Sequence, residues 1–305
     1  MNGIINIYKP SGMTSHSVVS RIRKFYGVKR VGHSGTLDPM ACGVLPVLVG
    51  NAASVQELIT GHDKVYRAGV LFGKITDTAD ITGKVLEERD VRFTSEQLEQ
   101  VIKSFVGEQE QVPPMYSAIK MDGVKLYDLA RQGIQVERKA RKITVYSIKI
   151  IKPFDGIRCE LEIACSKGTY IRTLGEDIGM KLGCGACLDS LERVACGGYK
   201  AEDAVNLDDI EKLYLEGNTA ALDKLLADPQ DLFLDLPKVR LVQFYTKLSL
   251  NGAEIYLKKA HIPEKIFSQT DMCRLYDENG NFFAVGQLSD FPDGKAIKIK
   301  YRFVK

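Results

Sequence analysis

The sequence predicts an α+β protein in two parts, a larger one over residues 1–235 and a smaller one over residues 236–305. Strand-like and amphipathic helical segments alternate without the regular strand–helix–strand repeat of a doubly wound parallel sheet. We therefore expect a mixed, largely antiparallel sheet flanked by helices. The length of 305 residues suggests two domains. An acidic stretch ends in the Pro-containing segment at 235–237, where few contacts are expected to cross.

The first elements follow from local patterns. Residues 3–8 are typical of a strand that ends at the turn around Gly12. Ser15 is expected to cap a helix that Gly27 ends. The apolar residues of this helix fall on one face: Val18, Val19, Ile22 and Phe25.

The middle of the chain continues in the same way. Thr94 and Gln97 form a capping-box pattern for a helix that runs to Phe105. Residues 143–151 are strand-like, and residues 157–165 alternate apolar and polar side chains as a half-buried strand does. A helix then opens at Thr169 and carries Arg172 in its first turn.

The smaller part is predicted to be a small β-barrel. The segments 272–276 and 282–285 flank Asn279-Gly280, a dipeptide favoured in tight hairpins. Residues 297–303 alternate apolar and basic side chains up to the end of the sequence.

Composition excludes several classes of protein. No apolar run approaches the ~20 residues of a membrane span, and Met1-Asn2-Gly3 leads into a strand without a charged leader. The 7 cysteines are scattered through apolar segments, which is typical of reduced thiols, so we expect a cytoplasmic protein. The sequence has neither a dinucleotide-binding glycine pattern on a strand–helix unit nor a P-loop.

Charge is unevenly distributed, although the net charge is only +3. Residues 1–36 hold six basic side chains and no acid, and residues 120–149 hold eight against three. Residues 236–305 hold twelve against seven, whereas residues 201–235 hold ten acids against two bases. This pattern is consistent with a basic face that binds a polyanion and an acidic face that is exposed to solvent. It is equally consistent with ordinary solvated surfaces that bind nothing.

The most informative segment is residues 32–39 (GHSGTLDP). Asp38 is the single acid between Lys9 and Glu57, so a mechanism with paired carboxylates has no local support. Pro39 restricts Asp38 to an extended conformation, and glycines allow a close approach. Asp38 is then a nucleophile, a base or a structural cap, and an ordinary turn remains the alternative.

Six blocks give the chain a family resemblance. It resembles the bacterial-type tRNA pseudouridine-55 synthases, the TruB family, in residues 8–15 (YKPSGMTS), 32–39, 64–67 (KVYR), 76–80 (TDTAD), 111–118 (QVPPMYSA) and 165–173 (CSKGTYIRT). Two departures concern RNA contacts: residues 52–54 read AAS where the family has Ala-Thr-Lys, and residues 191–193 read LER where it has Leu-Arg-Arg.

The resemblance implies a pseudouridine synthase fold with a PUA-like RNA-binding barrel at residues 236–305. It implies conversion of uridine 55 in the T arm of tRNA to pseudouridine. The base is flipped out, its glycosidic bond is cleaved, and uracil is rotated and rejoined through carbon. The implied partner is tRNA, the protein is expected to be a monomer, and no cofactor, metal or membrane is required.

The resemblance also implies roles for individual residues. Asp38 is the catalytic nucleophile, with attack on the sugar or on the uracil ring left open. Arg172 is expected to orient Asp38 through a planar fork of two hydrogen bonds. Tyr66 stacks on the flipped base and is able to take or give a proton.

Further residues are implied to bind substrate. Tyr170 flanks the same pocket, and Leu191 contributes backbone contacts to uracil. His33 fills the space that the flipped base leaves, and Lys9 supports the pocket floor.

Other interpretations remain beside this one. A non-catalytic RNA-binding protein could share the scaffold, and a glycosidase-like hydrolase would need a second carboxylate for which the sequence has no motif. Cys184, Cys187 and Cys196 suggest a zinc site, but a structural zinc needs four ligands and no histidine is near. Plain thiols are the simpler interpretation.

Overall fold

The strands of the larger part form one extensive sheet in the computed structural model, which describes residues 1–117, 119–121 and 123–304. Ala118, Asp122 and Lys305 lie outside the described residues. The strands of this sheet are β1 (Gly3–Lys9), β2 (Val31–His33), β3 (Cys42–Val49), β4 (Lys64–Phe72), β7 (Gly107–Gln111), β10 (Arg141–Lys152), β11 (Arg158–Cys165), β12 (Ala186–Cys196), β13 (Tyr199–Lys200) and β14 (Val205–Asn206).

Their order is β14-β1-β3-β12-β4-β11-β10-β7, with β2 added to β3 and β13 added to β12. The pairs β1–β14 and β3–β12 are parallel, and the other described pairs of this sheet are antiparallel. The predicted mixed, largely antiparallel sheet is confirmed. Two short hairpins lie outside it: β5 (Lys74–Thr76) with β6 (Val85–Glu88), and β8 (Lys120–Met121) with β9 (Val124–Lys125).

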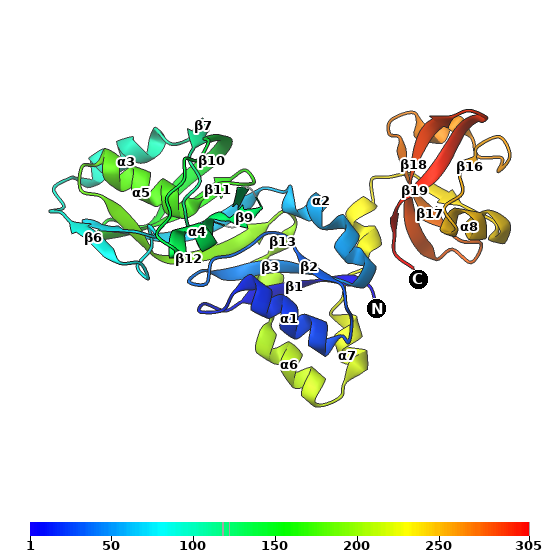
Figure 1. Cartoon of the computed structure of the whole chain (residues 1–305), viewed down its shortest axis with the longest axis horizontal. Coiled ribbons are helices and arrows are strands. Elements are labelled where there is room, and N and C mark those ends of the chain that lie inside the picture. Colours follow the sequence, from blue (N-terminus) through cyan, green and yellow to red (C-terminus); the bar gives the residue numbers. More distant parts are fainter. Residues whose placement is uncertain (118, 122, 305) are drawn as a thin grey trace.

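Helices cover the sheet at both ends of its length (Figure 1). The helix α1 lies with α6 and α7 against the β1–β3 end, and α3 and α5 lie at the β10–β12 end. The helices are α1 (Ser15–Phe25), α2 (Gln56–Thr60), α3 (Ser95–Lys103), α4 (Leu126–Arg131), α5 (Ile171–Lys181), α6 (Leu207–Leu215), α7 (Thr219–Lys224) and α8 (Gln243–Leu250), with 3-10 turns η1 (Gly50–Val55), η2 (Ala201–Asp203), η3 (Pro229–Phe233) and η4 (Glu264–Phe267).

The cap of α1 corrects one sequence prediction. Thr14, not Ser15, is the N-cap, and its side chain accepts the backbone N–H of Ser17 at 3.0 Å. Ser15 is the first helical residue, and its buried hydroxyl bonds elsewhere. Gly27 follows the end of α1 with a φ of +60°, the left-handed conformation that glycine adopts without steric cost.

Other local patterns hold with small shifts. The capping box of Thr94 and Gln97 is present, although α3 ends at Lys103, before Phe105. Strand β11 alternates buried and half-buried side chains from Arg158 onward, whereas Ile157 precedes it and is 54% exposed. Helix α5 begins at Ile171, two residues later than expected.

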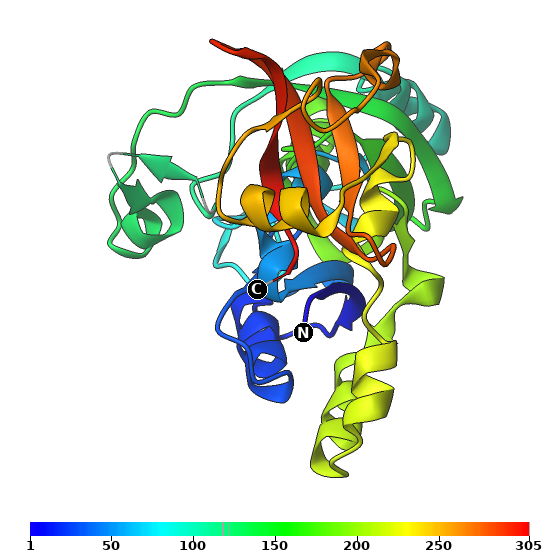
Figure 2. The same ribbon diagram turned by 90° about the vertical axis from the view of Figure 1, so that its right-hand side faces the viewer.

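The smaller part holds a curled five-stranded sheet, seen face on in Figure 2. Its order is β15-β17-β18-β19-β16, from β15 (Lys238–Arg240), β16 (Ile255–Tyr256), β17 (Met272–Tyr276), β18 (Phe282–Phe291) and β19 (Gly294–Arg302). Helix α8 was not predicted. The β17–β18 hairpin turns through Gly280 with a φ of +84°, whereas Asn279 has no positive φ, so the loop is wider than a two-residue turn.

The two parts meet in an apolar joint, which corrects the expectation of few crossing contacts. Ile4, Leu48, Ala52, Val55, Ile59 and Phe233 pack with Val285 and Phe303 of the smaller part. The side-chain amides of Asn2 and Asn51 donate to the backbone carbonyls of Phe303 and Val304. The ends of the described chain therefore lie together at this joint (Figure 1).

Within the described part of the chain, no helix combines the length and the apolar character that crossing a membrane requires.

Candidate active site

A cavity of about 650 Å³ opens where the 33–38 loop, α2, β4 and the start of α5 meet. Six of the seven predicted site residues line it: His33, Asp38, Tyr66, Tyr170, Arg172 and Leu191. Lys9 is the exception. The structure therefore brings together residues from four separate segments of the sequence.

Asp38 lies in the loop between β2 and β3, and its side chain is 34% exposed. Gly35 takes a φ of +129° in this loop, which a residue with a side chain rarely adopts. The backbone of Leu37 is bonded on both sides by the hydroxyl of Ser15. The loop thus presents a partly exposed carboxylate from a fixed backbone.

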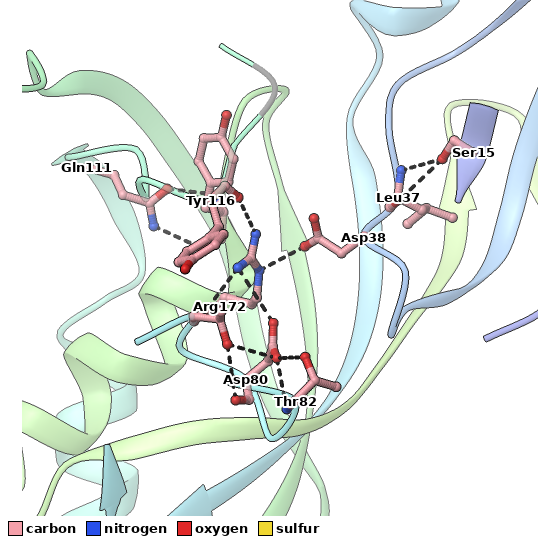
Figure 3. A network of polar contacts seen from close by, with 10 residues as sticks. Ser15, Leu37, Asp38, Asp80, Thr82, Gln111, Tyr116 and Arg172 are labelled. Carbon is pink, nitrogen blue, oxygen red and sulfur yellow. Dashed lines mark hydrogen bonds and ion pairs between the residues drawn. The ribbon is translucent and has the colours of Figure 1, made fainter. Parts of the chain in front are cut away.

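Arg172 reaches Asp38 through a single nitrogen. Its Nε donates to Asp38 Oδ2 at 2.8 Å, while Nη1 donates to the carbonyl of Thr78 at 2.7 Å and Nη2 to that of Tyr116 at 2.8 Å (Figure 3). The predicted two-bond fork to Asp38 is therefore wrong, because other groups occupy the terminal nitrogens. Arg172 is 4% exposed and lies in the first turn of α5, as predicted.

A second carboxylate, from Asp80, stands on the other side of Arg172. Its Oδ2 lies 3.6 Å from Arg172 Nη1, and its Oδ1 accepts the N–H of Thr82 at 3.0 Å and the hydroxyls of Thr78 and Thr82. The side chain is 6% exposed and does not line the cavity among the residues described. Asp80 belongs to the sequence block 76–80, but no local pattern links it to Arg172, 92 positions later.

Tyr66 stands on β4 beside Lys64, two residues earlier on the same strand, and both line the cavity. Burial raises the pKa of Tyr66 to about 12, against the opposing charge of Arg193. Its phenol is therefore protonated at neutral pH and can donate a hydrogen bond.

His33 ends β2 at the edge of the cavity. Its Nδ1 accepts the backbone N–H of Gly35 at 3.3 Å, which leaves Nε2 to carry the proton. Burial lowers the pKa of His33, so the ring is neutral at physiological pH.

Tyr170 and Leu191 complete the walls. Tyr170 is the N-cap residue of α5, and burial raises its pKa. Its backbone N–H and C=O are both bonded by the side-chain amide of Gln111. Leu191 lies on β12 opposite Ala68 and is 6% exposed.

Two buried cations support the Asp38 loop. Lys9 is fully buried and donates to the carbonyls of Met13 at 2.6 Å, Pro10 at 2.9 Å and Pro39 at 3.5 Å. Burial lowers its pKa to about 8. Lys9 therefore holds the segment after Asp38 and does not face the cavity.

Arg193, which sequence reasoning did not select, is 1% exposed and donates to the carbonyls of Val44 and Gly35. It lines the cavity beside Tyr66. Arg193 belongs to the block 191–193, in which Glu192 departs from the family pattern. The arginine beside that departure does match the pattern, and this match was the available signal.

The cavity is strongly basic. Asp38 is the one acid among its described lining residues, which include six basic side chains: Lys64, Arg141, Lys142, Lys167, Arg172 and Arg193. Such an excess of positive charge attracts a polyanion.

The three cysteines considered for zinc are buried free thiols. Cys187 and Cys196 lie near opposite ends of β12, opposite Leu71 and Lys64 of β4. In the part of the chain that the structure describes, no three His, Cys, Asp or Glu side chains gather as a metal site would require.

Comparison with protein families then decides the class. Residues 23–171 match the model described as "TruB family pseudouridylate synthase (N terminal domain)", and residues 172–234 match "tRNA pseudouridylate synthase B C-terminal domain". The chain belongs to the TruB family of pseudouridylate synthases. It is therefore an isomerase, as the resemblance implied.

Curated relatives that are similar over nearly the whole chain support the same family. A protein of Clostridium perfringens (strain 13 / Type A) named tRNA pseudouridine synthase B is 44% identical over 301 residues, which cover 98% of each chain. A relative of the same name from Clostridium acetobutylicum is 41% identical, covering 95% of this chain and 96% of the relative.

Solved structures support the fold. The chain is similar to one in "Crystal Structure of a Cbf5-Nop10-Gar1 Complex" with a TM-score of 0.68 and 25% identity, covering 99% of this chain and 85% of the other. A chain in "Structure of H/ACA RNP bound to a substrate RNA containing 2'-deoxyuridine" gives a TM-score of 0.67 at 23% identity, with the same coverage. The pseudouridine synthase fold with a PUA-like C-terminal sheet is confirmed.

Proposed function

We propose that this TruB-family enzyme converts uridine 55 in the T arm of tRNA to pseudouridine, with Asp38 as the nucleophile. The observation that carries the proposal is the setting of Asp38. It is a partly exposed carboxylate, the one acid among the described lining residues of a basic cavity, and Arg172 orients it. The curated relatives are named for pseudouridine synthesis in tRNA, which supports the choice of substrate.

The reaction moves a bond within one nucleotide. The base first leaves the helical stack, at a cost of a few kcal/mol. A carboxylate oxygen of Asp38 attacks either C1′ of the ribose or the uracil ring, and the bond between N1 and C1′ breaks. Uracil turns, C5 bonds to C1′, and the bond that Asp38 had formed breaks, which restores its free carboxylate. The proton on C5 leaves and N1 takes one up, so that no atom is gained or lost overall.

The other site residues bind the uracil base and orient Asp38. Protonated Tyr66 stacks on the flipped base and can donate a proton. Neutral His33 fills the space left in the RNA stack, and Tyr170 and Leu191 hold uracil from the sides. Arg172 keeps the carboxylate of Asp38 oriented, because its Nε donates to Asp38 Oδ2 at 2.8 Å.

A glycosidase-like hydrolase fits the site less well. Hydrolysis by two carboxylates requires both to face the substrate. The carboxylate of Asp80 is 6% exposed and is engaged by Thr78, Thr82 and Arg172.

The proposal extends to the whole protein. We infer a cytoplasmic monomer that needs no cofactor, with residues 1–235 carrying the chemistry and residues 236–305 adding RNA contacts. Two basic side chains of the smaller part, Lys295 and Lys298, form ion pairs with Glu264 and Glu254. Their contribution to RNA binding is therefore smaller than that of unpaired lysines.

The test is incubation of the full chain with an unmodified tRNA transcript, followed by position-resolved mapping of pseudouridine. Conversion at position 55, and none in a transcript with cytidine there, is the expected result. Binding without conversion would instead support an RNA-binding protein, and release of free uracil would support a hydrolase.

A further inference from the structure

Asp38 and Arg172 meet across 134 positions of sequence. Asp38 lies in a loop, and Arg172 lies in the first turn of a helix. Neither is held within the hydrogen-bond ladder of the central sheet. The distance between their side chains therefore depends on whatever fixes the loop and the start of α5.

Ser15 fixes the loop. Its hydroxyl accepts the backbone N–H of Leu37 at 2.9 Å and donates to the carbonyl of Leu37 at 3.2 Å. Ser15 is 2% exposed and Leu37 is 3% exposed, so water does not compete for these bonds. One side chain thus holds both polar groups of the residue directly before Asp38.

Gln111 fixes the start of α5 in the same way. Its Oε1 accepts the N–H of Tyr170 at 2.8 Å and its Nε2 donates to the carbonyl of Tyr170 at 3.0 Å. Gln111 is 4% exposed and is the last residue of β7, paired with Arg141 of β10. Its amide therefore extends the sheet by one bonded pair, onto the residue two positions before Arg172.

The two contacts lie at opposite ends of one network (Figure 3). Between them lies the bond from Arg172 to Asp38, which the backbone connects to Leu37 on one side and, through Ile171, to Tyr170 on the other. Ser15 and Gln111 are absent from the described lining of the cavity, so they do not face the substrate.

We propose that Ser15 and Gln111 are positioning residues, which set the distance and angle between Asp38 and Arg172 from opposite sides. The inference rests on the roles proposed above for Asp38 and Arg172. A shift of about 1 Å in a reacting group can cost about 100-fold in rate, so loss of either contact should act on the chemical step.

The first arm of the test changes Gln111 to Met, which keeps the length of the side chain and removes both bonds. Gln109 on the same strand is the matched control, because its amide donates to the carbonyl of Phe105 and not to α5. In Gln111→Met we expect kcat to fall about 10- to 100-fold and the KM for tRNA to change less than about threefold. Gln109→Met should keep both within about twofold.

The second arm changes Ser15 to Ala, with Ser17→Ala as the control on the exposed side of α1. The same separation of kcat from KM is expected. Gln111→Glu keeps the acceptor for the N–H of Tyr170 and loses the donor, so it should show an intermediate loss of kcat. This variant decides the case if Gln111→Met does not fold.

A double-mutant cycle separates positioning from stability. If Gln111 acts through Arg172, then Gln111→Met lowers the single-turnover rate of Arg172→Lys by less than about threefold. Equal losses in both backgrounds, or a loss no larger than that of Gln109→Met, would overturn the inference. Wild type and Asp38→Asn are run in parallel: an active Asp38→Asn protein refutes the proposed function itself, independently of the cycle.

Discussion

Arg172 holds Asp38 by one nitrogen, Nε, at 2.8 Å. The rest of its guanidinium is fixed by the carbonyls of Thr78 and Tyr116 and by the carboxylate of Asp80. The position of the guanidinium is thus determined by groups other than Asp38, and Asp38 is oriented by it. The second carboxylate oxygen of Asp38 receives no hydrogen bond from the described residues, so it is available to a substrate.

Asp38→Asn keeps the shape of the side chain and an acceptor for Arg172 but removes the charge. Turnover should fall below about 1% of wild type, while tRNA binding stays within about tenfold, because binding depends mainly on backbone phosphates. Rates on a tRNA transcript and a filter-binding titration measure the two effects. Turnover of several per cent would refute the nucleophile role, and loss of folding would favour a structural role.

Arg172→Lys keeps the charge and loses the planar geometry. Because Arg172 bonds two carbonyls and two carboxylates while buried, the change should lower both turnover and stability, the latter by about 1–3 kcal/mol. Urea denaturation and single-turnover kinetics report the two losses. Near-normal rates would show that the planar guanidinium is not required.

Asp80→Asn tests the group behind Arg172. The carbonyl of Asn can still accept from Thr82, but the ion pair with Arg172 is lost. We expect turnover to fall at least about tenfold with tRNA affinity unchanged, since Asp80 does not face the cavity. Asp77→Asn, in the same turn, serves as control. If the two variants lose equal activity, Asp80 acts on the turn and not through Arg172.

The apolar joint predicts that the smaller part stabilises the larger. Ending the chain at Asp235 uncovers Ile4, Leu48 and Val55, so the melting temperature should fall markedly. Phe303→Ala should cost about 3–4 kcal/mol in the full chain, and Phe244→Ala, at an exposed site, less than about 0.5 kcal/mol. Calorimetry compares them; equal melting temperatures would mean that the joint contributes no stability.

The lowered pKa of Lys9 predicts a specific pH dependence of the free energy of unfolding. Its pKa is about 8 in the fold against 10.5 when unfolded, so between these values the unfolded chain binds one more proton. Stability contributed by this residue therefore rises with pH across that window. Relative to Lys9→Met, the wild-type free energy of unfolding should rise by about 2–3 kcal/mol from pH 8 to 10.5. Buried tyrosines and cysteines act equally in both proteins, and a flat difference would contradict the prediction.

Local patterns predicted most of the fold. The alternation in β11 and the capping box of α3 depend on neighbouring residues, and both are present. The site was predictable where the family resemblance named residues, including the pairing of Asp38 with Arg172.

The contacts that the sequence did not predict join residues that lie far apart in the chain. The hydroxyl of Ser15 could cap a helix, but in the fold it bonds Leu37, 22 positions away. The contact of Asp80 with Arg172 and that of Gln111 with Tyr170 likewise leave no mark on local spacing. The joint could not be predicted for the same reason, because it brings Ile4 against Phe303, 299 positions later in the sequence.

The joint also fixes the distance between the cavity and the C-terminal sheet. Because η1 and α2 pack against the C-terminal sheet on one side while Gln56 and Thr60 of α2 line the cavity on the other, the sheet cannot move without disturbing the site. An RNA that touches both parts must span one set distance from its target uridine to the C-terminal sheet.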